Sequence, residues 1–275
     1  MHFPLPNEMV KALKALRPAL SDAVIIGGWA HRFHAEHPLA TPTFEPLFTT
    51  DCDIALPLEL AIAGPMSLEG SLSKEGFTCQ LVGNEMGEGR RYVLDDQPEF
   101  YLQFLTRRQG DGRMRQAQEI GGVLAEPLRG IDLALANSVE IDVPLRTSEI
   151  ITVNVVSPVA FLIGKLIVSN QSNRGYNRAK DLLYVLDTFR LFENALEELT
   201  VEASQVLSGL GIAQSRRLRN SIRTHFEGVG SPVLHEAIEL SSQAGGERPQ
   251  SEEQFRSIIQ YGIRFLLGEE WTPWS

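Results

Sequence analysis

Two aspartates, two residues apart, are the residues in this sequence best suited to carry chemistry. Asp51 and Asp53 belong to the segment Thr49-Thr50-Asp51-Cys52-Asp53-Ile54-Ala55-Leu56-Pro57, whose composition favours a strand. Side chains alternate along a strand, so both carboxylates are expected on one face and Cys52 on the other. Two like charges this close repel each other, and a cation between them would relieve the repulsion. Hard divalent cations such as Mg²⁺ are held by one or two carboxylates together with substrate phosphates.

Two adjacent glycines upstream supply a second part of such a site. The apolar run Val24-Ile25-Ile26 is followed directly by Gly27 and Gly28. Glycine has no Cβ atom, so backbone N–H groups at this turn can approach phosphate oxygens closely. Together with the aspartate pair, the turn predicts a metal-dependent nucleotide site.

The composition is that of a soluble globular protein large enough for one or two domains. The chain has 275 residues, of which 43% are hydrophobic, and no apolar run approaches the roughly 20 residues that span a bilayer. The formal net charge of −10 argues against broad nonspecific adhesion to nucleic acid. The N-terminus has no signal-peptide pattern, and two cysteines make no disulfide framework, so we expect a cytoplasmic protein without a membrane partner. Cys52 and Cys79 are both expected to be buried thiols.

The elements that must position the aspartates follow from hydrophobic periodicity. Helices are expected at 7–20, at 29–36 and in a segment ending near residue 75, and strands at 23–26, 48–56, 78–82, 91–94, 100–106, 121–124, 131–135, 140–143 and 150–155. From Ser157-Pro158 onward the sequence predicts helices, at 159–169, 178–189, 191–199, 201–209, 216–225, 232–242 and 252–267. The expected fold class is α+β, with a mixed β-sheet domain and flanking helices over 1–156 and a C-terminal helical domain over 157–275.

Gly27-Gly28-Trp29-Ala30 followed by Asp51-Cys52-Asp53 resembles the signature of the nucleotidyltransferase superfamily with the DNA polymerase beta fold. Within it the chain is most similar to the bacterial abortive-infection toxin group and its uncharacterised relatives. In that group a lysine on a helix is followed by a Lys/Arg-Asp pair opening the next helix, as Lys165 is followed here by Lys180-Asp181. The resemblance covers about residues 24–57 and 153–187.

The resemblance implies a role for each matching residue. Gly27 and Gly28 would cradle the phosphates of an NTP, with Thr50 and Gln103 also in the nucleotide site. Asp51 and Asp53 would hold one or two Mg²⁺ ions between the triphosphate and the attacking hydroxyl. Lys165 would neutralise phosphate charge, and Asp181 would orient Lys165 or assist the acceptor.

The sequence departs from this family in two places. The superfamily usually has a third carboxylate in an apolar run on a later strand, and the run Leu102-Gln103-Phe104-Leu105 places an amide there. Glu99 would share the face of Gln103 if that strand is regular. The toxin group tends to carry a second aspartate three residues after Asp181, but here that residue is Tyr184.

Three functions compete at this stage. The first is a Mg²⁺-dependent transferase that moves an NMP from an NTP to RNA or tRNA, a protein side chain or a small molecule, as the toxin of a toxin–antitoxin pair or outside one. The second is a catalytically degenerate relative that binds a nucleotide or a partner protein, which Gln103 favours. The third is an Asp-x-Asp glycosyltransferase, which gives no reason for Gly27-Gly28 or Lys165.

Three histidines on one predicted helix are a weaker metal candidate. His31, His34 and His37 are spaced by three residues, but His37 precedes Pro38, where a helix ends. We expect a polar helix face near the phosphates there instead of a metal site.

Overall fold

The computed structural model describes residues 3–84, 87–108, 117–145, 149–171, 177–227, 231–244, 248–249 and 251–273. The chain forms two compact units. Residues 2–36 and 48–157 make up the sheet unit, and residues 37–47 and 158–275, with Met1, make up the helical unit. The division into domains over 1–156 and 157–275 stays a prediction, but the segment 37–47 groups with the helical unit.

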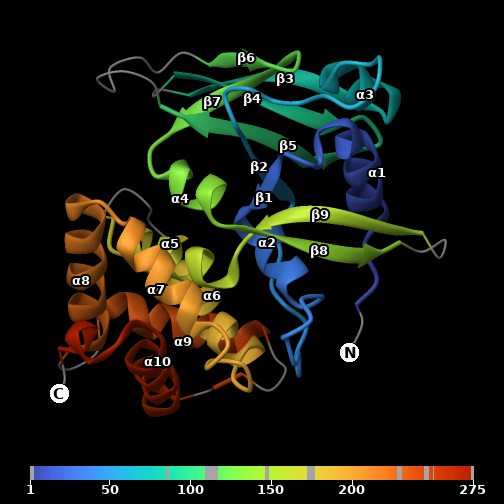
Figure 1. Cartoon of the computed structure of the whole chain (residues 1–275). Helices are drawn as coiled ribbons and strands as arrows, with labels where there is room; N and C mark the ends of the chain where they lie inside the picture. The colour runs from blue at the N-terminus through green and yellow to red at the C-terminus, as the bar shows by residue number, and fades with distance from the viewer. Residues whose placement is uncertain are drawn as a thin grey trace. The chain divides into compact units, whose positions relative to one another are not determined.

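One mixed sheet dominates the described part of the sheet unit (Figure 1). Its main path runs β3-β4-β5-β2-β1-β9-β8, and β7 pairs with both β5 and β6. The strands are β1 (Val24–Ile26), β2 (Asp51–Leu56), β3 (Phe77–Asn84), β4 (Gly87–Leu94), β5 (Gln97–Arg107), β6 (Gln118–Ile120), β7 (Val123–Leu128), β8 (Ser138–Pro144) and β9 (Ile150–Val156). Strand β2 lies in the middle, antiparallel to β1 and parallel to β5.

Short helices flank this sheet. They are α1 (Asn7–Leu16), which continues as a 3₁₀ turn over Arg17–Ala19, α2 (Gly27–His34), α3 (Leu68–Lys74) and α4 (Ile131–Ala136). Helix α1 is amphipathic and buries Met9, Leu13 and Leu16, which recur at helical spacing. The mixed sheet, its flanking helices and the helices that follow confirm the α+β fold class.

The expectations for residues 131–135 and for Cys79 are wrong. Residues 131–135 form helix α4 instead of a strand, because Ile131-Asp132-Leu133-Ala134 alternates like a strand but is rich in the helix formers leucine and alanine. The helix begins after Gly130, whose φ of 83° turns the chain. Cys79 is exposed, whereas Cys52 is buried as expected. Cys79 lies on β3, at one end of the main strand path, where one edge of the strand has no partner on that path.

The helical unit is built around α6 (Asn177–Leu191), which is buried along most of its length (Figure 1). It packs against α5 (Pro158–Ser169), α9 (Pro232–Ala244) and α10 (Glu252–Leu267). The remaining helices are α7 (Thr200–Gly209), α8 (Ile212–Phe226) and a 3₁₀ turn over Glu269–Trp271. None of the helices in the described part of the chain is long and apolar enough to cross a membrane.

The helix expected over 191–199 is absent, and that stretch forms turns. The carbonyl oxygen of Leu191 accepts a hydrogen bond from the N–H of Thr41 at 2.8 Å. The N–H of Ala195, which would bind that carbonyl in a continuing helix, donates to Phe192 O instead. A contact with the segment 37–47 therefore ends α6.

Candidate active site

Strand pairing places the two aspartates on the same face of β2. Asp51 and Asp53 are half-buried, while Cys52 between them is fully buried on the opposite face. Ile26, the last residue of β1, pairs with Asp53, and the chain leaves the sheet at Gly27 to begin α2. The aspartates therefore lie where β1 ends and α2 begins.

Gly27 and Asp53 approach each other more closely than any other residue type would allow. Gly27 has a φ of 68°, and a Cβ atom added to it would lie 2.6 Å from Asp53 Oδ2. The predicted link between the glycine turn and the aspartate pair is therefore present in the structure for Gly27 and Asp53. Gly28 is buried within the first turn of α2. The N-cap residue of this helix is Ile26, whose apolar side chain makes no hydrogen bond to the first N–H groups.

Strand β5 brings Gln103 next to Asp53. The two strands are parallel, with Asp51 paired to Tyr101 and Asp53 paired to Gln103. Paired residues of neighbouring strands share a face, so Gln103 occupies the position next to Asp53 on the aspartate face. Thr50 lies just before β2, where its carbonyl oxygen accepts from the N–H of Tyr101 at 3.2 Å.

Burial alternates along β5 from the exposed Glu99 to Gln103, but the pairing of this part of β5 with β4 is irregular. The register between β4 and β5 shifts between Val93 and Leu94, which pair with Tyr101 and Gln97. Three residues of β5, Glu99 among them, therefore have no partner on β4 and form the bulge themselves.

Tyr101 and Arg91 belong to the same face of the sheet, and the sequence analysis missed both. The Arg91 guanidinium lies 4.2 Å from the centroid of the Tyr101 ring. Burial raises the pKa of Tyr101, the charges of Asp51 and Asp53 add to the rise, and Arg91 opposes it. The same two carboxylates, after burial, also raise the pKa of Cys52. Alternation from Gln103 could have found Tyr101, but only the strand order brings Arg91 beside it.

In the helical unit, Lys165 and Asp181 form an ion pair. Lys165 Nζ donates to Asp181 Oδ1 at 2.9 Å, with the side chains 15% and 2% exposed. The predicted pairing is confirmed, and Lys165 does not extend to the surface. Its ammonium also lies 4.6 Å from the ring centroid of Tyr184, the residue that replaces the second aspartate. The ring face is an electrostatically favourable neighbour for a cation.

Comparison with known families decides the assignment of the chain. Residues 7–207 match the family described as Nucleotidyltransferase, which is well over half of the sequence. The chain belongs to this family. No curated protein matches the sequence. Among solved structures, an antigenic nucleotidyltransferase-like protein from Paracoccidioides brasiliensis is 14% identical, and the match covers 75% of this chain and 94% of that one, with a TM-score of 0.33. At that score the likeness adds nothing to the assignment.

Members of this family typically use Mg²⁺, and the residues present suit that ion. Within the described ranges, no group of three or more His, Cys, Asp or Glu side chains could hold a metal ion. Asp51 and Asp53 offer two hard carboxylates on one face, and Gly27, which has no Cβ, lets the Asp53 carboxylate lie against the turn at the start of α2. Two carboxylates completed by substrate phosphates are a usual Mg²⁺ environment.

His31, His34 and His37 do not form the polar helix face that was expected. His31 and His34 are completely buried, and His34 Nε2 lies 2.8 Å from the carbonyl oxygen of Val156. Burial also lowers the pKa of His37. His31 and His34 serve packing, since α2 is buried over nearly its whole length, whereas the half-buried His37 lies beyond the end of this helix.

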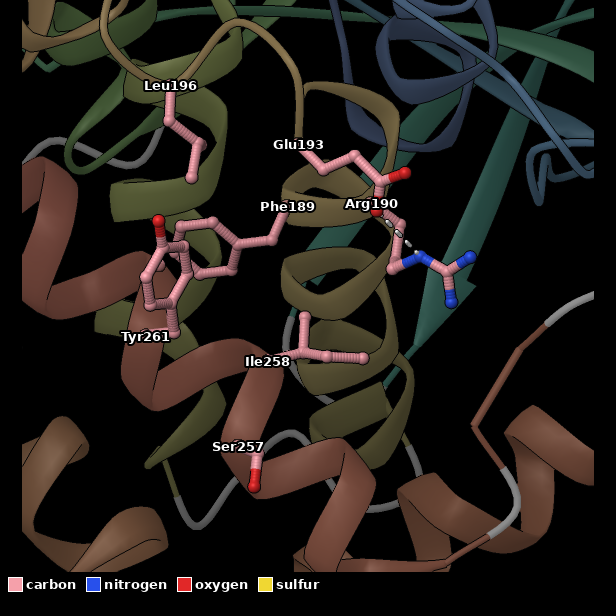
Figure 2. A pocket seen from close by; sticks show the side chains of 8 residues that line it. Phe189, Arg190, Glu193, Leu196, Ser257, Ile258 and Tyr261 are labelled. Carbon is pink, nitrogen blue, oxygen red and sulfur yellow. Dashed lines mark ion pairs between the residues drawn. The ribbon is translucent and has the colours of Figure 1, made fainter.

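The helical unit has a pocket whose lining includes none of the predicted site residues (Figure 2). It lies between α6 and α10, and Arg190 at its rim forms an ion pair with Glu193. Phe189, Leu196, Ile258, Tyr261 and Gly262 give it a mainly apolar lining. Its lining offers no pair of carboxylates and no lysine, so it does not suit a metal–triphosphate complex.

Proposed function

We propose that this protein is a Mg²⁺-dependent nucleotidyltransferase that moves an NMP from an NTP to an acceptor. The observation that carries the proposal is the close approach of Asp53 Oδ2 to Gly27, with Asp51 on the same face of β2. Family membership supplies the reaction class, and this arrangement supplies the residues that would perform it.

The reaction needs positioning and charge neutralisation more than covalent chemistry by the protein. An acceptor oxygen attacks the α-phosphorus of the NTP, the bond to the β-phosphate oxygen breaks, and pyrophosphate leaves while the acceptor's proton passes to solvent. Asp51 and Asp53 would hold Mg²⁺, which neutralises charge on the phosphates when it is bound. The N–H groups in the first turn of α2, starting at Gly27, would bind phosphate oxygens. Thr50 borders this position and would contact the nucleotide.

Lys165 is proposed to neutralise triphosphate charge, and its ion pair with Asp181 supports the idea that Asp181 orients it. Lys165→Met should lower the transfer rate at least 100-fold, because a positioned cation is lost where negative charge develops. Lys165→Arg should recover part of that rate, and Arg217→Met, which removes an exposed cation from α8, should leave it unchanged. Steady-state transfer assays measure these rates. A normal transfer rate of Lys165→Met would show that Lys165 is not part of the active site.

A second candidate function, nucleotide binding without transfer, is favoured by one observation. Gln103 occupies the position paired with Asp53, and an amide cannot accept a proton at neutral pH. General-base catalysis typically contributes about 10²- to 10⁴-fold, and its loss at Gln103 would leave binding as the main activity, whereas a Gln103 protein that still transfers should be slow.

The decisive experiment incubates the protein with each α-³²P-labelled NTP, Mg²⁺ and cell extract, and then separates labelled RNA, protein and small molecules. Label in one fraction identifies the acceptor class, and a labelled tRNA or target protein would support a toxin role that an antitoxin restrains. Asp51→Asn should abolish labelling, whereas Asp132→Asn, which changes an exposed acid on α4, should not. NTP binding by calorimetry without label in any fraction would favour the binding-only function. Neither binding nor label would contradict both.

A further inference from the structure

A carboxylate that the sequence analysis did not consider contacts Gln103 from the neighbouring strand. Gln103 Nε2 donates to Glu126 Oε2 at 3.3 Å. The other oxygen of the same carboxylate, Glu126 Oε1, accepts from the backbone N–H of Arg90 at 2.8 Å. Glu126 is therefore held by β4 as well as by β5, which fixes the position of its carboxylate.

Strand order decides on which side of Gln103 this carboxylate lies. Strand β5 has β2 along one edge, where Gln103 pairs with Asp53. Strand β7 pairs with β5 through Leu105 and Glu126, in the stretch that also pairs with β2, so β7 occupies the opposite edge. Gln103 thus stands between Asp53 on one side and Glu126 on the other.

The hydrogen bond between Gln103 and Glu126 determines the orientation of the Gln103 side-chain amide. An ionised carboxylate only accepts hydrogen bonds, so the NH₂ group of Gln103 must face Glu126. The carbonyl oxygen of a primary amide points away from its NH₂ group. With the NH₂ group turned toward β7, that oxygen is directed away from Glu126 and is available to the neighbouring strand β2, which carries Asp53.

We propose that Glu126 is a positioning residue that turns the Gln103 oxygen toward the aspartate pair, where it serves as a neutral third ligand for the divalent cation. The proposal rests on the proposed function, because it assumes that Asp51 and Asp53 bind that cation. The metal site would then consist of two negatively charged carboxylates and one neutral amide oxygen. An amide oxygen is a hard ligand that suits Mg²⁺ and Mn²⁺ but cannot take a proton.

The test measures Mn²⁺ binding alone by calorimetry, with no nucleotide present. Partners that orient a metal ligand typically contribute 10- to 100-fold to affinity, so Glu126→Ala should raise the Kd for Mn²⁺ about tenfold. Glu126→Gln should weaken binding less, because an amide at this position can also accept from Gln103. Glu119→Gln, which removes an exposed carboxylate from neighbouring β6, should leave the Kd unchanged.

Exchanging the two residues in a double variant distinguishes a positioning role of Glu126 from a merely structural one. In Q103E/E126Q the amide on β7 donates to the carboxylate on β5, so the hydrogen bond stays and the cation site gains a charge. The double variant should bind Mn²⁺ about tenfold more tightly than the native protein, since charged ligands to a cation are the stronger ones. Gln103→Glu alone should gain less, because it places two like charges at about the native 3.3 Å.

The outcomes are distinguishable. If Asp51→Ala abolishes Mn²⁺ binding while Glu126→Ala and Q103E/E126Q bind like the native protein, with each variant folded by circular dichroism, the role of Glu126 is overturned and the proposed function stands. If Asp51→Ala does not change Mn²⁺ binding, the metal site fails, and the proposed function fails with it.

Discussion

At the scale of single residues, the contact between Gly27 and Asp53 makes a sharp prediction. Gly27→Ala should lower NTP binding in the presence of Mg²⁺ at least tenfold, because the new methyl group would lie 2.6 Å from Asp53 Oδ2 and displace that carboxylate. Calorimetry with a non-hydrolysable NTP measures the effect.

Gly130→Ala is the matched control for this substitution. Gly130 has a φ of 83°, close to the 68° of Gly27, but a Cβ there would meet no atom within 4 Å. Both variants carry the backbone strain of alanine at positive φ, and only the first moves a carboxylate. Equal binding by the two variants would contradict the role given to Gly27.

The residues of the site were predictable where alternation along one strand was enough. Asp51, Asp53 and Gln103 follow from the period of two, and the structure places them on one face. Glu126 was not predictable, because its contact with Gln103 depends on β7 pairing with β5, a fact that no local pattern contains. Lys165 and Asp181 were paired correctly by the family resemblance, since both lie on helices whose periodicity is clear.

At the scale of elements, two glycines on helices should respond in opposite ways to the same substitution. Gly262→Ala should lower the free energy of unfolding by about 1–3 kcal/mol, because its Cβ would lie 2.3 Å from the Phe189 ring, and α10 could not keep its distance from α6. Gly164→Ala, on α5 with no atom within 4 Å, should raise it by up to about 1 kcal/mol. Urea denaturation measures both. Destabilisation by Gly164→Ala as large as that by Gly262→Ala would show that helix packing does not explain the difference.

The elements themselves were predicted well where the hydrophobic period was long and unbroken. Helices α5, α6 and α10 and strands β2, β5 and β9 fall close to their expected positions. The wrong predictions, for residues 131–135 and 191–199, have physical causes that local periodicity does not contain. Residues 131–135 alternate over too few positions to separate strand from helix, and α6 ends at Leu191 because the distant Thr41 binds its carbonyl.

At the scale of the whole molecule, a buried ion pair joins parts of the chain that are far apart in sequence. Arg248 donates to both carboxylate oxygens of Asp187, at 2.9–3.1 Å, and to the carbonyl oxygen of Glu45 at 2.8 Å. Its guanidinium also lies 4.4 Å from the ring centroid of Phe44. The side chains of Arg248 and Asp187 are 2% and 0% exposed. This cluster connects the segment 37–47, α6 and the chain before α10.

Arg248→Met should lower the free energy of unfolding by about 3–5 kcal/mol, because it leaves the Asp187 carboxylate buried without its counter-ion. The double variant Asp187→Leu/Arg248→Met should lose much less, since no charge is then left buried. Thermal or urea denaturation of the native protein, both single variants and the double variant forms a complete cycle. Additive losses would show that the two charges do not depend on each other.

The stability of the helical unit should also depend on pH through His225. Burial, reinforced by the charge of Arg178, lowers the pKa of His225 from 6.5 to about 4. Between these values the unfolded chain binds a proton that the folded chain does not, so stability falls as the pH is lowered from about 6.5 toward 4. The loss attributable to this residue should approach about 3 kcal/mol.

Denaturation at pH 7 and pH 4.5 measures this effect. His225→Gln should reduce the difference between the two values, whereas His235→Gln, at an exposed position, should not. A native-like difference in His225→Gln would assign the pH dependence to other groups.

The segment 37–47 is made early in synthesis but belongs to a unit that is completed late. Glu45 and Arg248, which bind each other, are 203 residues apart. At about 5–20 residues per second, about 10–40 s pass between the addition of Glu45 and the addition of Arg248 to the nascent chain. During that interval the hydrogen bond between Arg248 and Glu45 cannot form, although the strands of the sheet unit can already pair. The nascent chain should therefore be cut by proteases between residues 37 and 47 until translation has passed α9, and resist them afterwards.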